Sequence, residues 1–254
     1  MSGCGDCRNN EALGFEFTMA FQPIVDVEES RILSYEALVR GLKQESAASI
    51  LAQVNDGNRY QFDQTARVKA IELAASLDLD TLLNINFLPN AVYRPEACIQ
   101  TTLQASQKHG LATNRLLFEI TEGEEVTQHE HIRNIFTEYK RQGIQTAIDD
   151  FGAGYSGLNL LAEFQPDWIK LDMKLVRDIE RHPPRVAIVR GILSVCAELG
   201  IQVIAEGIET LAEYRVLRDL GVRYYQGYLF ARPGFETLPA VDFEAFLDAD
   251  PKSI

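Results

Sequence analysis

Two adjacent carboxylates, Asp149 and Asp150, stand between a short apolar run and a glycine-rich loop. The run at 146–148 suits a buried strand, whereas two neighbouring like charges can be buried there only beside a cation. A divalent metal ion would meet that need. Because neighbouring strand residues point to opposite faces, both acids reach one site only if the backbone turns there. The loop supplies residues that permit such a turn, namely Gly152, Gly154 and Gly157. The alternative is a solvated turn after a strand.

More ionisable and amide side chains occur late in other strand-like segments. They are Glu36, Asn86, Glu119, Lys170, Glu206 and Gln226. A single buried acid is usually paired with a lysine or arginine, but several acids on separate strands cannot all pair with one lysine. Carboxylate and amide oxygens without histidine or cysteine suit Mg²⁺ or Mn²⁺ better than zinc. Two such ions can hold the oxygens of a phosphoryl group, so these residues predict a metal-dependent phosphoester hydrolase.

Strand-like and helix-like segments alternate along almost the whole chain. Residues 18–27 and 32–39 are expected to form the two strands of a hairpin, joined by a polar turn at 28–30. Further strands are expected at 82–87, 116–120, 144–149, 168–171, 202–205 and 223–226, and helices at 47–55, 61–77, 95–109, 129–142, 185–199, 210–220 and 244–248. This alternation predicts an α/β fold with a single TIM-like (β/α)8 barrel, in which the strand ends meet at one mouth.

The composition is that of an ordinary globular protein, with 46% hydrophobic and 24% charged residues among 254. A net charge of −13 without a basic stripe argues against binding of a DNA or RNA polymer. The first residues lack the basic and apolar regions of a signal peptide, and no apolar run is long enough to span a membrane. We therefore expect a cytoplasmic protein without membrane association.

The cysteines fall into two groups. Cys98 and Cys196 lie in helix-like segments and are expected in or near the core. Cys4 and Cys7 form a CxxC pair without a second CxxC or a nearby histidine pair, so a reduced tail is favoured over a metal or redox role. The expected organisation is an N-terminal tail at 1–16, a barrel at 17–248 and a C-terminal tail at 249–254.

A series of short motifs runs through the chain. They are FQPI at 21–24, EAL at 36–38, NFLP at 86–89, EITE at 119–122, DDFGAGYSGL at 149–158, IKLD at 169–172, AEGIET at 205–210, QGY at 226–228 and RP at 232–233. Together they resemble the EAL-domain family of bacterial cyclic di-GMP phosphodiesterases over about residues 17–248. Departures are Leu88, where serine is common in the family, and the segment 41–59.

The resemblance implies a barrel whose first strand runs antiparallel to the rest. It also implies hydrolysis of cyclic di-GMP to linear pGpG with two divalent cations, Mg²⁺ or Mn²⁺, and inhibition by Ca²⁺. By motif match, the metal ligands are Glu36, Asn86, Glu119, Asp149, Asp150 and Glu206. The residues expected to act in catalysis are Lys170, Glu206, Glu36 and Asp149, and Lys170 would hold and polarise the attacking water.

The resemblance assigns the remaining roles to residues around this centre. Those expected to contact substrate are Gln22, Arg40, Gln226 and Pro233, and Arg40 suits a phosphate because its donors are forked. Asp172 and Glu209 would orient ligands or water, and Glu122 would anchor the glycine-rich loop. Glu206 stays open between general base and metal ligand; we favour the ligand, because two cations already lower the pKa of the water.

Two readings other than catalysis are open. The first is a receptor that holds cyclic di-GMP without turnover, which the intact ligand set disfavours. The second is a scaffold that acts through protein contacts, with the Cys4/Cys7 tail as one candidate segment. A homodimer is expected from the resemblance, in which the glycine-rich loop lies near the interface.

Overall fold

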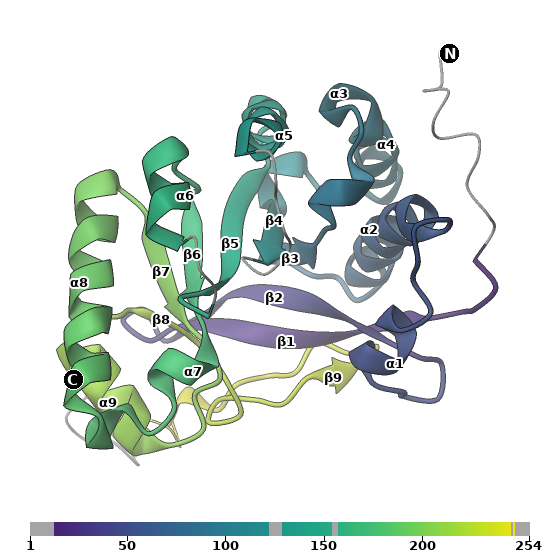
Figure 1. Ribbon diagram of the computed structural model, residues 1–254. Coiled ribbons are helices and arrows are strands. Elements are labelled where there is room, and N and C mark those ends of the chain that lie inside the picture. Colours follow the sequence, from purple (N-terminus) through teal and green to yellow (C-terminus); the bar gives the residue numbers. More distant parts are fainter. Residues whose placement is uncertain (1–12, 122–128, 154–156, 245, 247–254) are drawn as a thin grey trace.

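Eight strands close into a barrel, and helices surround it (Figure 1). The structure, a computed structural model, describes residues 13–121, 129–153, 157–244 and 246. The strands are β1 (Thr18–Asp26), β2 (Arg31–Arg40), β3 (Leu82–Asn86), β4 (Leu116–Thr121), β5 (Gln145–Phe151), β6 (Trp168–Leu171), β7 (Gln202–Ala205), β8 (Tyr224–Gln226) and the short β9 (Gly234–Phe235). The order in the sheet is β2-β3-β4-β5-β6-β7-β8-β1-β9, and β1 also pairs with β2. The barrel fold predicted from the sequence is therefore confirmed.

Strand β1 closes the barrel against the direction of the others. It pairs antiparallel with β2 and with β8, whereas every neighbouring pair from β2 to β8 is parallel. The predicted hairpin and the antiparallel first strand are thus both confirmed. The hairpin register places Gln22 directly opposite Glu36.

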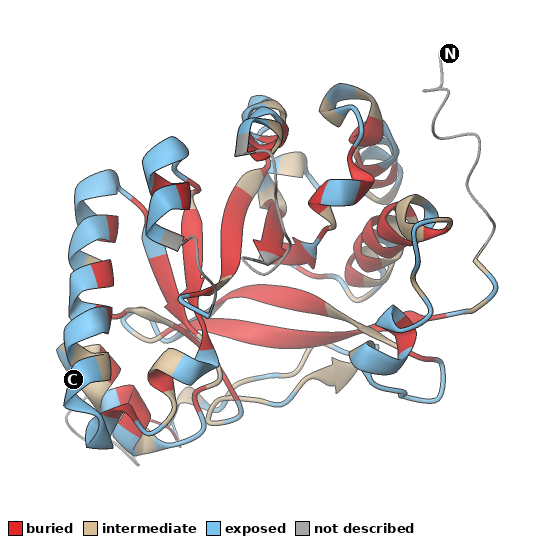
Figure 2. Cartoon of the chain, in the orientation of Figure 1, coloured by how far each residue is buried: buried red, intermediate tan, exposed pale blue. Residues whose placement is uncertain are grey.

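The helices cover the outside of the barrel. They are α1 (Ala47–Leu51), α2 (Arg59–Ser76), α3 (Pro95–Cys98), α4 (Gln100–His109), α5 (His129–Arg141), α6 (Gly157–Glu163), α7 (Met173–Val176), α8 (Pro183–Leu199) and α9 (Leu211–Asp219), with 3-10 turns at Pro89–Ala91, Thr113–Arg115 and Ile179–Arg181. Their inner sides are buried and their outer sides exposed (Figure 2). Within the described ranges, none of them has the length and apolar character needed to cross a membrane.

The barrel interior changes from apolar to polar along the strands. A small apolar cluster fills one end and consists of Ile24, Leu33, Leu117, Ala147, Trp168 and Ile204. Residues two positions apart on a strand share a face. Glu119 follows Leu117, and Lys170 follows Trp168, by two positions. The plug of apolar side chains therefore sits beneath a polar layer at the carboxyl ends of the strands.

Some elements differ from the sequence-based expectation. The helix expected at 95–109 divides at Ile99 into α3 and α4, and Gly110 ends α4 in the left-handed conformation. The short helices α6 and α7 and the strand β9 were not predicted. The short helix expected at 244–248 lies mostly outside the described residues.

Candidate active site

A fully buried lysine stands at the centre of the polar layer. Lys170 Nζ lies close to carboxylates from four other segments, at 3.1 Å from Glu36, 2.9 Å from Glu119, 3.3 Å from Asp149 and 2.5 Å from Glu206. Each of these side chains comes from a different strand or strand end. The structure therefore brings together the four residues that the sequence predicts to act in catalysis.

Amide side chains hold two of these carboxylates. Asn86 Nδ2 donates to Glu36 Oε1 at 2.8 Å, and Gln226 Nε2 donates to Glu36 Oε2 at 2.8 Å. Asn84 Nδ2 donates to Glu119 Oε1 at 2.5 Å. Gln226 also donates to Gln22 Oε1 at 3.3 Å, which links the first and last strands of the barrel across the site. The amides fix the direction in which Glu36 and Glu119 project.

The backbone turns at the Asp149–Asp150 pair. The register of β5 with β6 shifts between Ile148 and Phe151, and Asp150 adopts a φ of 54°. The N–H of Asp150 donates to Asp149 Oδ1 at 2.9 Å. The turn thus lies at Asp150 itself and continues into Gly152, at φ 95°, whereas Gly154 lies outside the described residues. This bulge lets two adjacent acids serve one site.

The excess of carboxylates changes the pKa values of the group. Burial raises the pKa of Glu119 most strongly, attraction to Lys170 lowers it, and repulsion from Glu36 raises it again. The resulting pKa is about 8. Burial and the Asp149 charge also raise the pKa of Glu206 well above its ordinary value and that of Asp150 to about 6. Burial lowers the pKa of Lys170, but the carboxylates, Asp149 foremost, outweigh it and keep this lysine charged.

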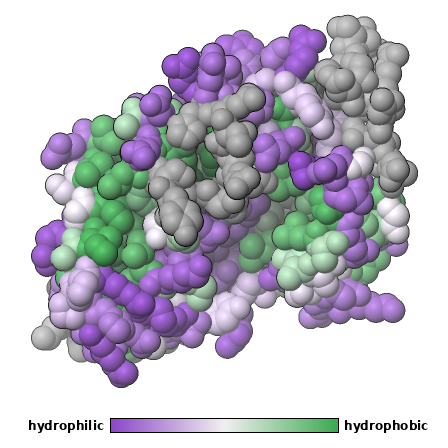
Figure 3. Space-filling view, viewed as in Figure 1, coloured by the Kyte–Doolittle hydropathy of each residue, from purple (hydrophilic) through white to green (hydrophobic). Residues whose placement is uncertain are grey.

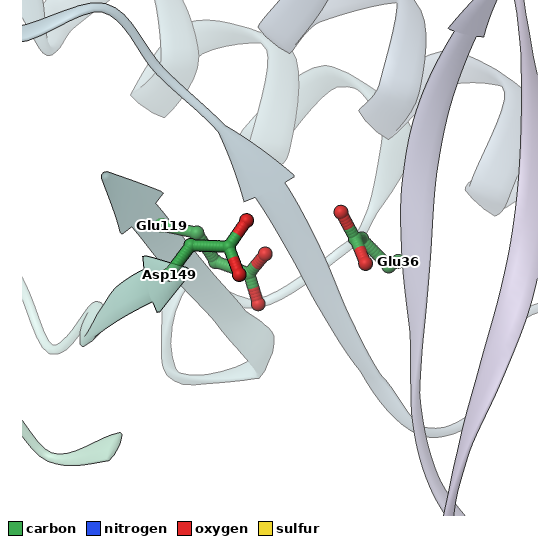
Figure 4. Close-up of side chains that lie close together, drawn as sticks. All are labelled: Glu36, Glu119 and Asp149. Carbon is green, nitrogen blue, oxygen red and sulfur yellow. The ribbon is translucent and has the colours of Figure 1, made fainter. Parts of the chain in front are cut away.

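The acids offer two groups of oxygens at the spacing of metal ligands. Glu36, Glu119 and Asp149 form one group, and Asp149, Asp150 and Glu206 form the other, each with ligand atoms within 4.8 Å of one another. Figure 4 shows the first group projecting into a common space from separate strands. Because one lysine cannot neutralise five acids, and all donors are oxygens, this arrangement fits two hard divalent cations that share Asp149.

Two cavities flank these acids. One, of about 300 Å³, is lined by Gln22, Glu36, Asp149, Asp150, Lys170, Met173, Glu206, Gly207, Glu209, Gln226, Gly227 and Tyr228. The other, of about 380 Å³, is mainly apolar; it shares Glu36 and Asp149 with the first and reaches Asn86, Leu88 and Asp63. The acids therefore lie between a polar and an apolar compartment, both open to a small molecule.

Comparison with known proteins identifies the family. The model of the EAL domain matches residues 8–233. The chain belongs to the EAL family. The structure of a standalone versatile EAL protein from Vibrio cholerae, in its c-di-GMP bound form, is 53% identical with a TM-score of 0.89 and covers 92% of this chain and 99% of that one.

Longer proteins are also similar to this chain. Klebsiella pneumoniae BlrP1, in a manganese and cyclic di-GMP complex, is 38% identical with a TM-score of 0.83, covering 90% of this chain and 58% of that one. The Escherichia coli antirepressor BluF, regulated by blue light and temperature, is 34% identical over 223 residues, 87% of this chain and 55% of BluF. The chain thus spans about half the length of BluF.

Other predicted residues of the EAL motifs lie farther from Lys170. Glu209 lines the polar cavity and pairs with Arg177 at 2.8 Å, and Asp172 caps α7 while lying against Asp150. Arg40 donates to the carbonyl of Val39 at 2.7 Å and, like Pro233, is not among the residues that line either cavity. Glu122 lies outside the described residues.

Three residues near the EAL site were not predicted. Asn84 is fully buried and binds Glu119, and a signal was available, because it lies two positions before Asn86 on the same strand face. Met173, the first residue of α7, and Tyr228, which follows β8, also line the polar cavity. Met173 has no residue type that marks a site in sequence, whereas Tyr228 belongs to the QGY motif at 226–228.

Proposed function

We propose that this chain is a cyclic di-GMP phosphodiesterase that hydrolyses one phosphodiester to give linear pGpG. The observation that carries the proposal is the convergence of carboxylates from separate strands on Lys170, at 2.5 to 3.3 Å. Such a cluster is electrostatically costly unless cations bind there. The similarity to an EAL protein with c-di-GMP bound, over nearly the whole of that chain, supports the choice of substrate.

Each residue has a defined task in this proposal. Mg²⁺ or Mn²⁺ would be held by Glu36, Asn86, Glu119, Asp149, Asp150 and Glu206. When bound, two such cations lower the pKa of the attacking water and stabilise charge on the phosphoryl oxygens. Lys170 orients that water through its ammonium donors, and Gln226 and Gln22 hold the wall of the polar cavity. Glu206 serves as a ligand rather than as a separate base.

Arg40 and Pro233 are proposed to meet the substrate at the rim. The Arg40 side chain is half-buried, and its Nη1 donates to the carbonyl of Val39 at 2.7 Å. A phosphate oxygen would be a stronger acceptor than that carbonyl, because a charged donor and acceptor form the stronger bond. We expect the guanidinium to turn toward the phosphate when nucleotide binds.

Turnover with defined metals tests the proposal. Purified protein is incubated with cyclic di-GMP in Mg²⁺, Mn²⁺, Ca²⁺ or EDTA, and the product is identified by mass spectrometry. We expect pGpG with Mg²⁺ or Mn²⁺ and none with EDTA or Ca²⁺. Glu36→Ala and Asp149→Ala should each lower turnover by at least about 10²-fold, while the exposed control Glu72→Ala should not.

The same assay separates catalysis from binding. Tight binding of cyclic di-GMP in metal-replete buffer without product would show a receptor instead of an enzyme. Equal turnover in wild type, Glu36→Ala and Asp149→Ala would show that the site is wrongly assigned. If the protein neither hydrolyses nor binds cyclic di-GMP, the remaining function is that of a scaffold that acts through protein contacts.

We also propose that the chain is a cytoplasmic homodimer that associates through α8. Three large apolar side chains on this helix are exposed, Ile188 at 51%, Val195 at 37% and Leu199 at 42%. Their spacing of seven and four residues places them on one face, here called the α8 stripe. Figure 3 shows hydrophobic surface on this side of the molecule, where α6 and α8 lie. A second copy of the chain is the proposed cover.

A further inference from the structure

A charged pair is buried beside the site without contacting the acids around Lys170. Asp63 and Arg67 lie one turn apart on α2, both almost fully buried, with Arg67 Nη2 at 2.6 Å from Asp63 Oδ2. Arg67 Nη1 also donates to the Tyr139 hydroxyl at 3.0 Å. None of the roles proposed above uses this pair. Its burial is costly because both charges lose their hydration, and removing one partner alone would destabilise the protein by roughly 3–5 kcal/mol.

Both members of the pair contact the residues that follow Asn86. The N–H of Leu88 donates to Asp63 Oδ1 at 2.9 Å. The Arg67 guanidinium lies over the Phe87 ring, 5.2 Å from its centroid, and over the Phe118 ring at 5.1 Å. Residues 87–88, which follow β3, are therefore held by two side chains of α2, Asp63 and Arg67.

The position of this segment decides where the Asn86 side chain points. Asn86 is the last residue of β3, and its amide reaches Glu36 Oε1 at 2.8 Å. On the other side of β3, the Phe87 N–H donates to the carbonyl of Glu119 at 3.0 Å. Beyond Phe87, the chain leaves the sheet, and the Leu88 N–H finds its acceptor in Asp63. A change at this bond would be transmitted to Asn86 through only two residues.

We infer that Asp63 is a positioning residue for the metal site: its carboxylate anchors the Leu88 N–H and thereby fixes Asn86 as a ligand. Arg67 keeps the Asp63 charge compensated in the interior and holds Phe87 in place. The inference rests on the proposed function, because it presumes that Asn86 binds a cation. It assigns a reason for a buried ion pair that apolar residues of similar volume could replace at little cost in stability.

Two double variants separate the effect of the hydrogen bond between the Leu88 N–H and residue 63 from the effect of the ion pair. Asp63→Leu/Arg67→Met removes both charges and the acceptor for Leu88. Asp63→Asn/Arg67→Met also removes both charges but keeps an acceptor oxygen at position 63. The two variants share the loss of the Arg67 contacts with Phe87 and Tyr139 and differ in the anchor. Thermal melting confirms folding, and Mn²⁺ binding is measured without nucleotide by calorimetry and electron paramagnetic resonance.

We expect the Asn-containing variant to bind Mn²⁺ within about threefold of wild type, and the Leu-containing variant to bind about 10- to 100-fold more weakly. Equal affinity in all three proteins, or an equal loss in both variants, overturns the inference. If wild type itself binds no Mn²⁺, the proposed function fails first. Should either double variant not fold, Asp63→Asn is compared with Asp63→Leu while Arg67 is kept, so that both proteins carry the same unpaired guanidinium and still differ in the acceptor for Leu88; equal Mn²⁺ affinity in these two also overturns the inference.

Discussion

At the level of single residues, Lys170 is the point on which the site depends. It is fully buried and its ammonium lies within 3.3 Å of four carboxylates. Lys170→Met leaves those acids without a counter-charge, so the metal-free variant should lose on the order of 3 kcal/mol in free energy of unfolding near pH 8. Turnover should fall by about 10²-fold or more. Urea denaturation, with and without Mn²⁺, measures the first effect.

Bound Mn²⁺ should restore the stability of Lys170→Met but not its turnover. Bound cations replace the missing charge, so Mn²⁺ is expected to stabilise Lys170→Met more than wild type. Asp56→Asn, which breaks an exposed pair with Arg59, is the control for stability. A variant as stable as wild type without metal would show that the lysine does not compensate the acids.

Glu119 predicts how stability changes with pH. Burial, ahead of the nearby charges, raises its pKa to about 8 from 4.5 in the metal-free protein. The folded state therefore binds this proton more tightly than the unfolded state, and the stabilisation is lost as pH rises through that range. The Tm of metal-free protein should fall between about pH 5.5 and about pH 8.5. Glu119→Gln, which cannot titrate, should reduce this fall in calorimetric melting curves, and Asp150 and Glu206, whose pKa values are also raised, account for the remaining fall.

Acids whose pKa is lowered do not disturb this test. Those bound to arginine or to backbone N–H groups, such as Asp26 and Glu213, are ionised in both states above about pH 5. A wild-type Tm that stays constant or rises toward pH 8.5 would contradict the buried-acid explanation.

The sequence predicts residues by type better than by conformation. Adjacent acids after an apolar run indicated a metal site, yet the φ of 54° at Asp150 has no signature, because aspartate only tolerates that region. Asn84 and Asp63 escaped notice for another reason. Their partners, Glu119 and the Leu88 N–H, are 35 and 25 residues away, so these contacts arise only from the fold, although the place of Asn84 two residues before Asn86 did indicate the face on which it lies.

At the level of elements, the buried carboxylate of Glu213 connects the segments that follow β6 and β7. Glu213 accepts from the N–H groups of Asp178 at 3.0 Å, Glu209 at 3.0 Å and Thr210 at 3.1 Å. Arg177 completes the tie, because its guanidinium donates to Gly207 O at 3.2 Å and to Glu209 at 2.8 Å. These contacts fix the segment that follows Glu206.

Glu213→Ala should therefore destabilise the protein and loosen this segment. Three part-buried N–H groups would lose their acceptor at about 1 kcal/mol each, so a loss on the order of 3 kcal/mol is expected. Glu213→Gln keeps one acceptor oxygen and should lose about half as much. Denaturation measures the loss, and hydrogen exchange should show faster exchange at 207–210. An alanine variant as stable as wild type would contradict this role.

Element boundaries were predictable where glycine or a cap marks them. Gly110 and Gly200 end α4 and α8 in the left-handed conformation, and Thr210 forms a capping box with Glu213. The break at Ile99 has no such marker. Its φ of −73° is ordinary for a helix, so no local conformational signal predicts the separation of α3 from α4.

At the level of the whole molecule, the barrel could be predicted because one regularity repeats along the chain. From β2 to β8, strands alternate with helical segments, and these strands carry the polar residues of the site late in the strand or directly after it. The motifs then add the direction of β1, which alternation alone does not predict. Association between copies could not be predicted in the same way, because the sequence does not show which apolar side chains of a helix are exposed on the folded surface.

The α8 stripe leads to the last prediction. If copies associate through it, Val195→Glu places charges in an apolar contact and should shift the protein from dimer to monomer, with at least about a tenfold increase in the dissociation constant. Gln104→Glu adds the same charge on exposed α4, across the barrel in Figure 1, and should leave association unchanged. Sedimentation equilibrium measures both. A wild type that is monomeric at high concentration, or a dimer insensitive to Val195→Glu, would remove α8 as the interface while leaving the proposed hydrolysis untouched.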